Sequence, residues 1–293
     1  MEGLARNVDR FPDAQPAVSA GFAPAPPARR WRPAPFVAGS IGLHGAAALG
    51  ALVVPEAWPW ALGAVAANHA LLGAAGMWPR GKWLGPNMTR LPAAAARRGE
   101  IALTFDDGPD PQVTPRVLDL LDAAGCRATF FCIAEHARAH PALCRDMVRR
   151  GHAVENHSLE HRGSFALHTL GGFRREIGTA QEALAQITGV APRFFRPPAG
   201  LRNPLLDPVL HELVLALVTW TRRGFDTRTR DPARVGRRLL RGLAAGDILL
   251  MHDGHAGRTP SGGAVVLETL PRVLEAVRSR ELRAVTLREA IEP

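Results

Sequence analysis

The second part of the chain alternates short apolar runs with longer amphipathic stretches. From residue 100 onward, seven runs have the length and composition of buried strands: 101–105, 128–133, 152–155, 194–196, 213–220, 247–251 and 284–285. Helical patterns lie between them, for example at 113–124, 141–150, 173–188, 232–241 and 264–280. This repeated order of strand and helix favours a parallel sheet with crossover helices, either open or closed into a barrel.

Before residue 80 the pattern differs, because two long segments show no alternation. Segments 36–54 and 60–78 each hold nineteen residues without Asp, Glu, Lys or Arg, and the residues PEAWP separate them. A helix of that length spans a hydrocarbon core of about 30 Å. Tryptophans, which prefer the membrane interface, lie at the ends of the segments: Trp58, Trp60, Trp78 and Trp83. We therefore expect a transmembrane helical hairpin at 36–78.

Two alternatives to this hairpin remain open. Ala and Gly are only weakly apolar and the segments include His44, Asn68 and His69, so the pair would also suit burial in a soluble domain. A secretory signal peptide fits less well, since the apolar stretch begins far from the N-terminus and a second one follows it. The preceding residues 1–35 are rich in Ala, Pro and Arg, and we expect a disordered tail there.

Basic residues flank the hairpin on both sides but are absent from its connection. They are Arg29, Arg30 and Arg32 before it, and Arg80 and Lys82 after it. The positive-inside rule then places both flanks in the cytoplasm. We expect an inner-membrane protein whose basic linker (79–99) and second domain (100–293) lie on the cytoplasmic face, with the periplasmic face as the alternative.

Composition narrows the choice of partners. The net charge is +9 at pH 7, and the basic residues are scattered rather than grouped with aromatics, so we expect no nucleic-acid partner. The three cysteines, Cys126, Cys132 and Cys144, are odd in number and have no CxxC spacing. They are typical of buried thiols in a reducing compartment.

Polar residues that bind metals follow two of the expected strands. Asp106 and Asp107 end the first apolar run, and ENHSLEH after the third run offers His157 and His161 at i and i+4, on one face of a helical turn. Two imidazoles and one carboxylate provide three protein ligands, the number found in catalytic zinc sites. A cation would also relieve the repulsion between the adjacent carboxylates, leaving one of them ionised as a base.

Two further strand ends carry groups suited to the same chemistry. Arg196, in FFRPPAG, would hold a carboxylate ionised and oriented. His252, in ILLMHDGH, is a candidate general acid, and Asp226 would orient its imidazole. Taken singly, Arg196 is typical of a surface arginine before a turn and Asp226 of a turn residue. Only together do they suggest a site.

The motifs TFDDGPD, NHSLEH, RPPAG, FD and LLMHD occur here in the order seen in NodB-like polysaccharide deacetylases, the carbohydrate esterases of family four. The resemblance covers about residues 101–285. It implies a distorted (β/α) barrel with fewer than eight strands, here a (β/α)7 catalytic domain after the hairpin. It also implies a divalent metal, usually zinc, held by Asp107, His157 and His161. The implied catalytic residues are the base Asp106, its tether Arg196, the acid His252 and its support Asp226.

Substrate contacts are implied for Ala199, whose backbone N–H would stabilise the oxyanion, and for Pro198 and Trp220. The chain departs from the family here, which often has Tyr at the position of Ala199. Its fourth motif commonly reads D-x-x-D-W, where this chain has Arg223, Asp226 and Thr227. The chemistry is retained while the sugar groove is altered. We expect solvated or structural roles for His136, His140, His152 and His168, and a possible substrate contact for His255.

These observations predict a membrane-anchored, metal-dependent hydrolase that removes an N-acetyl group from an amino sugar, in a lipid-linked glycan or a cell-envelope precursor. Its partners would be that sugar and membrane lipid. The main alternative is a periplasmic polysaccharide or peptidoglycan deacetylase, N- or O-linked. A degenerate sugar-binding module would normally have lost a ligand or the base. A non-heme iron oxygenase also uses two histidines and a carboxylate, but it leaves Asp106 and His252 without a role.

Overall fold

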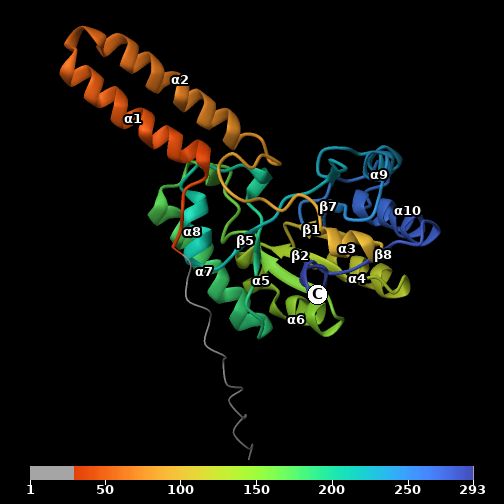
Figure 1. Ribbon diagram of the computed structural model, residues 1–293. Helices are drawn as coiled ribbons and strands as arrows, with labels where there is room; N and C mark the ends of the chain where they lie inside the picture. The colour runs from red at the N-terminus through yellow and green to blue at the C-terminus, as the bar shows by residue number, and fades with distance from the viewer. Residues whose placement is uncertain (1–29, 293) are drawn as a thin grey trace, which may run out of the picture. The chain divides into compact units, whose positions relative to one another are not determined.

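The computed structural model describes residues 30–292 (Figure 1). The expected disordered tail at 1–35 therefore lies almost entirely outside the described residues. Helix α1 (Pro35–Val53) begins at residue 35, the last residue of the expected tail. Its first helical residue is therefore a proline. Proline suits that position because its missing N–H would have had no partner in the helix.

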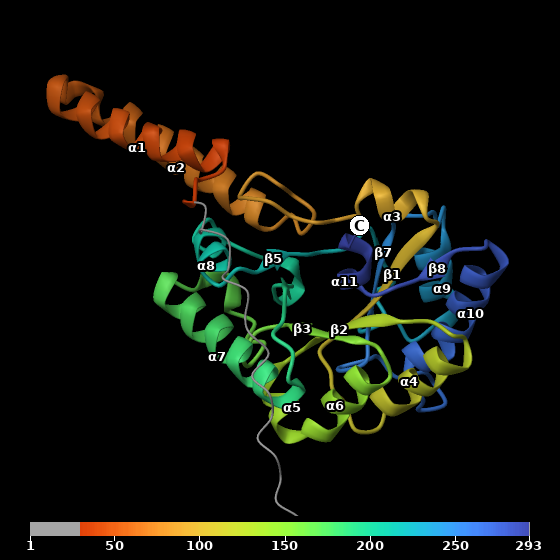
Figure 2. The same cartoon turned by 60° about the horizontal axis from the view of Figure 1, so that its bottom comes forward.

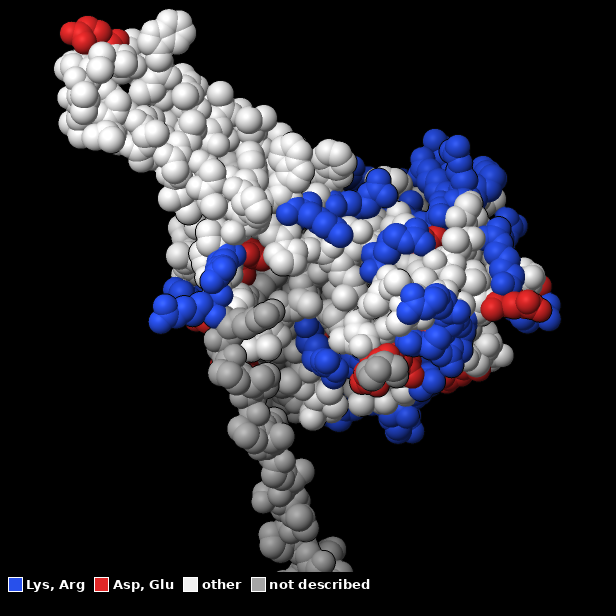
Figure 3. All heavy atoms as spheres, viewed as in Figure 1, with Lys and Arg blue, Asp and Glu red and all other residues white. Residues whose placement is uncertain are grey.

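The two apolar segments form helices α1 and α2 (Trp58–Gly76), joined by the single turn η1 (Pro55–Ala57). They pack as an antiparallel pair (Figure 1), and Asn68 donates a hydrogen bond to Ser40 across it at 2.7 Å. In Figure 3 this pair is almost free of charged atoms, since Glu56 is the only charged residue between 35 and 76.

Only α1 among the described helices is long and apolar enough to cross a membrane, with a mean hydropathy of 1.7. Helix α2 falls short, because Trp58, Pro59, Trp60, Asn68 and His69 lower its hydropathy. The helical hairpin is therefore present at the expected residues. That it spans a membrane stays a prediction.

The segment expected as a basic linker, 79–99, is packed against the rest of the chain. Leu84 and Leu91 are buried in it, and it contains helix α3 (Ala93–Arg97). Met88 forms a parallel bridge with Val218, and Asn87 accepts a hydrogen bond from the Thr219 hydroxyl. These residues cover one edge of the sheet and do not form an open linker.

The sheet has eight strands, and all its strand pairs are parallel. The strands are β1 (Glu100–Asp106), β2 (Ala128–Cys132), β3 (Ala153–Asn156), β4 (Phe194–Phe195), β5 (Ala216–Leu217), β6 (Arg222–Arg223), β7 (Ile248–His252) and β8 (Arg283–Ala284). Their order is β5-β4-β3-β2-β1-β7-β6, with β8 paired to β1. Both edges come from one short stretch of chain, so the sheet curls round on itself (Figure 2).

The expected strand at 213–220 is wrong in its bounds. Helix α8 (Leu206–Glu212) is followed by a turn in which Val214 has φ of 55°, and only Ala216–Leu217 is a strand. The chain then leaves the sheet and rejoins it as β6 at two arginines. An apolar pattern could not reveal that strand. The curled parallel sheet agrees with the expected α/β class, with eight strands where seven were expected.

Helices surround the outside of the sheet (Figure 2). Besides α8 they are α4 (Thr114–Ala123), α5 (Ala134–Ala139), α6 (Pro141–Arg149), α7 (Leu170–Thr188), α9 (Pro232–Leu240) and α10 (Val265–Ser279), with single turns η2 (Phe165–Leu167) and η3 (Pro198–Gly200). Helix α11 (Leu287–Ile291) instead packs through Leu287 and Ala290 on the cluster that includes Ala102 of β1. Helix α7 has Thr169 as its N-cap and ends at Gly189 in the left-handed conformation. Such caps satisfy backbone groups that a helix end leaves unpaired.

Alternation along β1 decides which side chains enter the barrel. Leu103 and Phe105 point outward and join the large core under the surrounding helices. Ala102 belongs to a separate inner cluster, and Thr104 contacts Arg196 inside the sheet. Because strand side chains alternate between faces, Asp106 also points inward, at the carboxyl end of the strand.

Candidate active site

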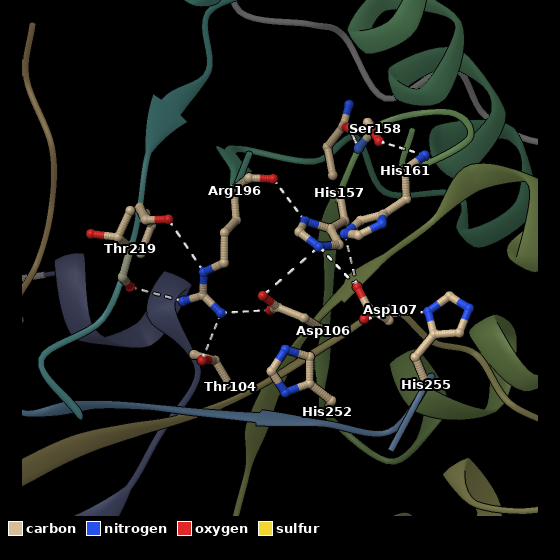
Figure 4. Close-up of polar contacts among 12 residues, drawn as sticks. Thr104, Asp106, Asp107, His157, Ser158, His161, Arg196, Thr219, His252 and His255 are labelled. Atoms are coloured by element: carbon tan, nitrogen blue, oxygen red, sulfur yellow. Dashed lines mark hydrogen bonds and ion pairs between the residues drawn. The ribbon is translucent and has the colours of Figure 1, made fainter. Parts of the chain in front are cut away.

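A cavity of about 280 Å³ lies at the carboxyl ends of the strands. Parallel α/β barrels build their sites at this end. The residues that line the cavity are Asp106, Asp107, His157, His161, Ala199, Trp220, Arg223, Thr227, Arg228, Leu250, His252 and His255. Figure 4 shows how the aspartates and histidines of this group face one another.

Asp106 and Asp107 reach the same cavity although they are adjacent. Consecutive side chains in a strand point to opposite faces, so a continued strand would have separated the two carboxylates. The strand instead ends at Asp106, and Asp107 has φ of 72°. A positive φ in a residue other than glycine costs roughly 1–3 kcal/mol and is concentrated at functional sites. The turn directs both carboxylates into the cavity.

Asp107, His157 and His161 form the cluster that was expected to hold a metal. Oδ1 of Asp107 lies 3.1 Å from Nε2 of His157 and 3.3 Å from Nε2 of His161. The expected helical turn is absent, because residues 157–161 form a loop in which Ser158 and His161 have positive φ. The Ser158 hydroxyl accepts a hydrogen bond from the His161 backbone N–H and holds this loop.

The donor set of this cluster fits a cation. The Nδ1–H of His157 donates to the backbone carbonyl of Arg196 at 2.7 Å, which turns its Nε2 toward Asp107 and would leave the Nε2 lone pair to a bound cation. A backbone carbonyl in this role is a common way to orient a metal-binding histidine. Burial and the neighbouring His157 lower the pKa of His161 to about 4, which leaves its imidazole neutral. Two imidazoles and a carboxylate, all within 4.8 Å of one another, thus present lone pairs to one point.

Asp107 remains ionised in this setting. Burial alone would raise the pKa of Asp107, but hydrogen bonds from His157 and His255 and the field of His252 lower it far below its usual range. An ionised carboxylate is the form that binds a cation.

Arg196 lies behind Asp106 and is fully buried (Figure 4). One guanidinium nitrogen donates to Asp106 at 2.6 Å and to the Thr104 hydroxyl at 2.8 Å. The other two nitrogens donate to the backbone carbonyls of Val218 and Thr219, and the Phe131 ring lies 4.1 Å from the guanidinium carbon. Burial lowers the pKa of Arg196, but arginine remains charged in proteins. The arginine therefore fixes the position of the Asp106 carboxylate.

His252 and Asp226 form a second buried pair on the other side of the cavity. Asp226 accepts from the Nδ1–H of His252 at 2.9 Å and from its backbone N–H at 2.7 Å. Burial alone would lower the pKa of His252, but Asp226 and the nearby Asp106 and Asp107 raise it to about 9. The imidazole is protonated at neutral pH and can donate a proton into the cavity.

The three expected substrate contacts differ in their placement. Ala199 lines the cavity with φ of 54°, and Trp220 lines it as well. Pro198 is buried and is not among the residues that line it, so its contact with substrate stays a prediction.

Three further residues belong to this region. His255 lines the cavity, with its Nδ1 3.4 Å from Asp107. His136, expected to be solvated or structural, donates to the backbone carbonyl of Asp107 at 2.9 Å and supports its unusual turn. Arg223 lines the cavity where the resembling family commonly has Asp. The only feature of the sequence that could have placed Arg223 in the cavity is its position just after the expected strand at 213–220.

Comparison with known proteins agrees with this arrangement. A sequence model of the family described as polysaccharide deacetylase matches residues 93–218, which include the metal-binding cluster, Asp106 and Arg196. A peptidoglycan-N-acetylglucosamine deacetylase of Bacillus cereus is 31% identical over 195 residues, 65% of this chain and 67% of that protein. A chitooligosaccharide deacetylase of Azorhizobium caulinodans is 34% identical over 163 residues, 54% of this chain and 75% of that protein.

Some relatives are much longer than the matched region. A peptidoglycan-N-acetylglucosamine deacetylase of Listeria monocytogenes is 34% identical over 172 residues, and this chain spans 36% of its length. Among solved structures, a peptidoglycan N-acetylglucosamine deacetylase bound to a substituted N-oxidanyl-benzamide matches with a TM-score of 0.63 and 27% identity. The match covers 70% of this chain and 92% of that one.

Proposed function

This chain belongs to the NodB-type polysaccharide deacetylase family and is a hydrolase of the carbon–nitrogen bond in N-acetylated amino sugars, and we propose that it acts on a lipid-linked glycan or cell-envelope precursor. The observation that supports catalysis is the position of Asp107 within 3.3 Å of two imidazoles, beside an Asp106 that Arg196 holds in place. A degenerate binding module would not need to keep this set.

Asp107, His157 and His161 would hold a divalent cation, which we propose to be Zn²⁺. When bound, such a cation polarises the acyl carbonyl and lowers the pKa of a water molecule. The carbonyl of Arg196 keeps the His157 lone pair directed at this point, and His136 holds the backbone of Asp107.

Asp106 is the proposed general base. Its Oδ1 is held by Arg196, while its Oδ2 lies 3.9 Å from Nε2 of His157 and so faces the metal-binding cluster. The arginine fixes the orientation of the carboxylate. Asp106 can therefore accept the proton of an attacking water without moving.

His252 is the proposed general acid. It enters the reaction protonated, because Asp226 stabilises the imidazolium, and it gives a proton to the departing amine as the carbon–nitrogen bond breaks. Ala199 lines the same cavity, and its backbone N–H would stabilise the oxyanion that forms on the acyl carbonyl oxygen. Trp220 would pack against the sugar ring.

The activity is tested on the purified chain with small N-acetylated sugars. We expect release of acetate from an N-acetylglucosamine oligosaccharide, its loss after treatment with a chelator, and its recovery on adding Zn²⁺. A lipid-linked precursor and intact peptidoglycan are then compared as substrates. Acetate release that survives complete removal of metal would refute the mechanism.

We propose that α1, with α2, anchors the protein in a bacterial inner membrane, with the catalytic domain on the cytoplasmic face. Large apolar side chains of this pair are exposed, among them Leu52 and Trp60, and basic residues flank it. A C-terminal alkaline phosphatase fusion should be inactive, and a C-terminal green fluorescent protein fusion should fluoresce. The opposite result would place the domain in the periplasm and favour peptidoglycan, the substrate named for the Bacillus cereus relative.

A further inference from the structure

The cavity holds a positive charge that neither the fold nor the proposed reaction uses. Arg223 lines the cavity, and its Nε is buried without a hydrogen-bond partner. No ion pair involves Arg223 among residues 30–292. A buried donor without a partner in a cationic group costs free energy, and a bound ligand would supply the missing partner.

Nearby carboxylates form no ion pair with Arg223 among the described residues. Both oxygens of Asp226 accept hydrogen bonds from His252, while Oδ1 of Asp106 accepts from Arg196 and its Oδ2 faces the metal-binding cluster. Asp106 and Asp226 favour the charge of Arg223 through their field, without a direct contact.

Aromatic rings hold the Arg223 guanidinium in place. Its central carbon lies 5.1 Å from the ring centroid of Trp220 and 5.0 Å from that of Phe225. Rings over a guanidinium face leave its N–H edge free, and that planar edge matches the oxygens of a phosphate or a carboxylate. Arg228 is exposed, lines the same cavity and has no side-chain partner among the described residues.

The positions of Arg223 and Arg228 in the fold indicate which part of the substrate they would contact. Arg223 is on β6, beside Leu250 of β7, and β7 ends at the acid His252. The acyl group must face the cluster of Asp107, whereas the leaving amine faces His252. The sugar ring that carries this amine therefore extends toward β6.

We propose that Arg223 and Arg228 form a subsite for an oxyanion, a phosphate or a carboxylate, on the sugar near the acetamido carbon. This inference rests on the proposed function and narrows the substrate class to anionic amino sugars. Hydrogen bonds between charged groups are worth enough to favour the anionic sugar by about 10- to 100-fold. A neutral sugar would leave the guanidinium unpaired.

The test compares three probes: N-acetylglucosamine 1-phosphate, N-acetylmuramic acid and methyl N-acetylglucosaminide. The wild type should have a kcat/KM about 10- to 100-fold higher for one of the two anionic probes than for the neutral one. The anionic probe with the higher kcat/KM shows whether the subsite prefers a phosphate or a carboxylate. Arg223→Gln and Arg228→Gln should each reduce the anionic-to-neutral ratio, while Arg145→Gln, an exposed arginine on α6, should leave it unchanged.

Calorimetric binding of the same probes separates this inference from the proposed activity. If no probe loses acetate, the proposed reaction fails, and tighter binding of an anionic probe that Arg223→Gln abolishes would still support the subsite. Equal affinity or equal kcat/KM for all probes, unaltered in both variants, would overturn it.

Discussion

The proton on His252 can be removed from the chemistry by changing Asp226 to Asn. Asn keeps the shape of the side chain and one acceptor oxygen, but it lacks the charge that stabilises the imidazolium. The difference between a pKa of about 9 and the ordinary value of 6.5 corresponds to about 3 kcal/mol. In Asp226→Asn the burial of His252 persists, so we expect its pKa to fall to about 6.5 or lower.

The consequence for activity has a definite direction. At pH 7.5 almost all of the wild-type imidazole is protonated, whereas about a tenth or less is protonated at a pKa of 6.5. The rate at pH 7.5 should drop at least tenfold, and the alkaline limb of kcat/KM should move down by about 2.5 pH units or more. A cation bound at Asp107 would lower the alkaline limb of the wild type and that of the variant together. The difference between these two limbs is therefore the quantity to measure.

Stability should follow the same proton. The pKa of His252 is higher in the folded chain than in the unfolded one, so its contribution is complete below pH 6.5 and is lost as the pH rises through about 9. Urea unfolding should show Asp226→Asn to be less stable at pH 6, with a smaller difference at pH 10. Asp119→Asn, an exposed carboxylate, should leave the rate profile unchanged. An alkaline limb that is the same in Asp226→Asn and wild type would refute the assignment of His252 as acid.

Other changes test the metal-binding cluster and the base. His157→Ala should lose bound metal and activity together, measured by elemental analysis, while the exposed His211→Ala should keep both; metal retained at full occupancy by His157→Ala would contradict the ligand set. Asp106→Asn should keep its metal and lose about 10²–10⁴-fold in rate, and loss of metal would exchange the roles of the two aspartates. Arg196→Met should cost about 3–5 kcal/mol of stability by leaving Asp106 unpaired, and adding Asp106→Asn should restore part of it. Additive losses would show that the pair is not coupled.

Sequence alone could locate much of the candidate site. Parallel strands bring their carboxyl ends to one edge, so polar residues after successive apolar runs must converge there. Asp106, His157 and His252 all lie in the cavity for this reason. The helical hairpin could also be predicted from the sequence, because the backbone groups of a long uncharged segment are best satisfied by hydrogen bonds within its own helix.

The local geometry of the site depended on tertiary structure. The spacing of His157 and His161 suggested a helix, yet a loop with left-handed residues brings them to Asp107. Such backbone strain is stable only where surrounding contacts impose it. Here the His136 ring holds the backbone of Asp107 from another part of the chain, and the Ser158 hydroxyl holds the backbone of His161 within the loop.

The sequence by itself determined which chemical groups the strand ends carry and that they meet at one edge of the sheet. Only the tertiary structure decided the full burial of Arg196 against Asp106 and the placing of Arg223 in the cavity on a two-residue strand. The physical reason is that an apolar pattern records burial along one element. The partner of a buried charge is set by contacts between residues far apart in the chain, as with Arg196 and Asp106, ninety positions apart.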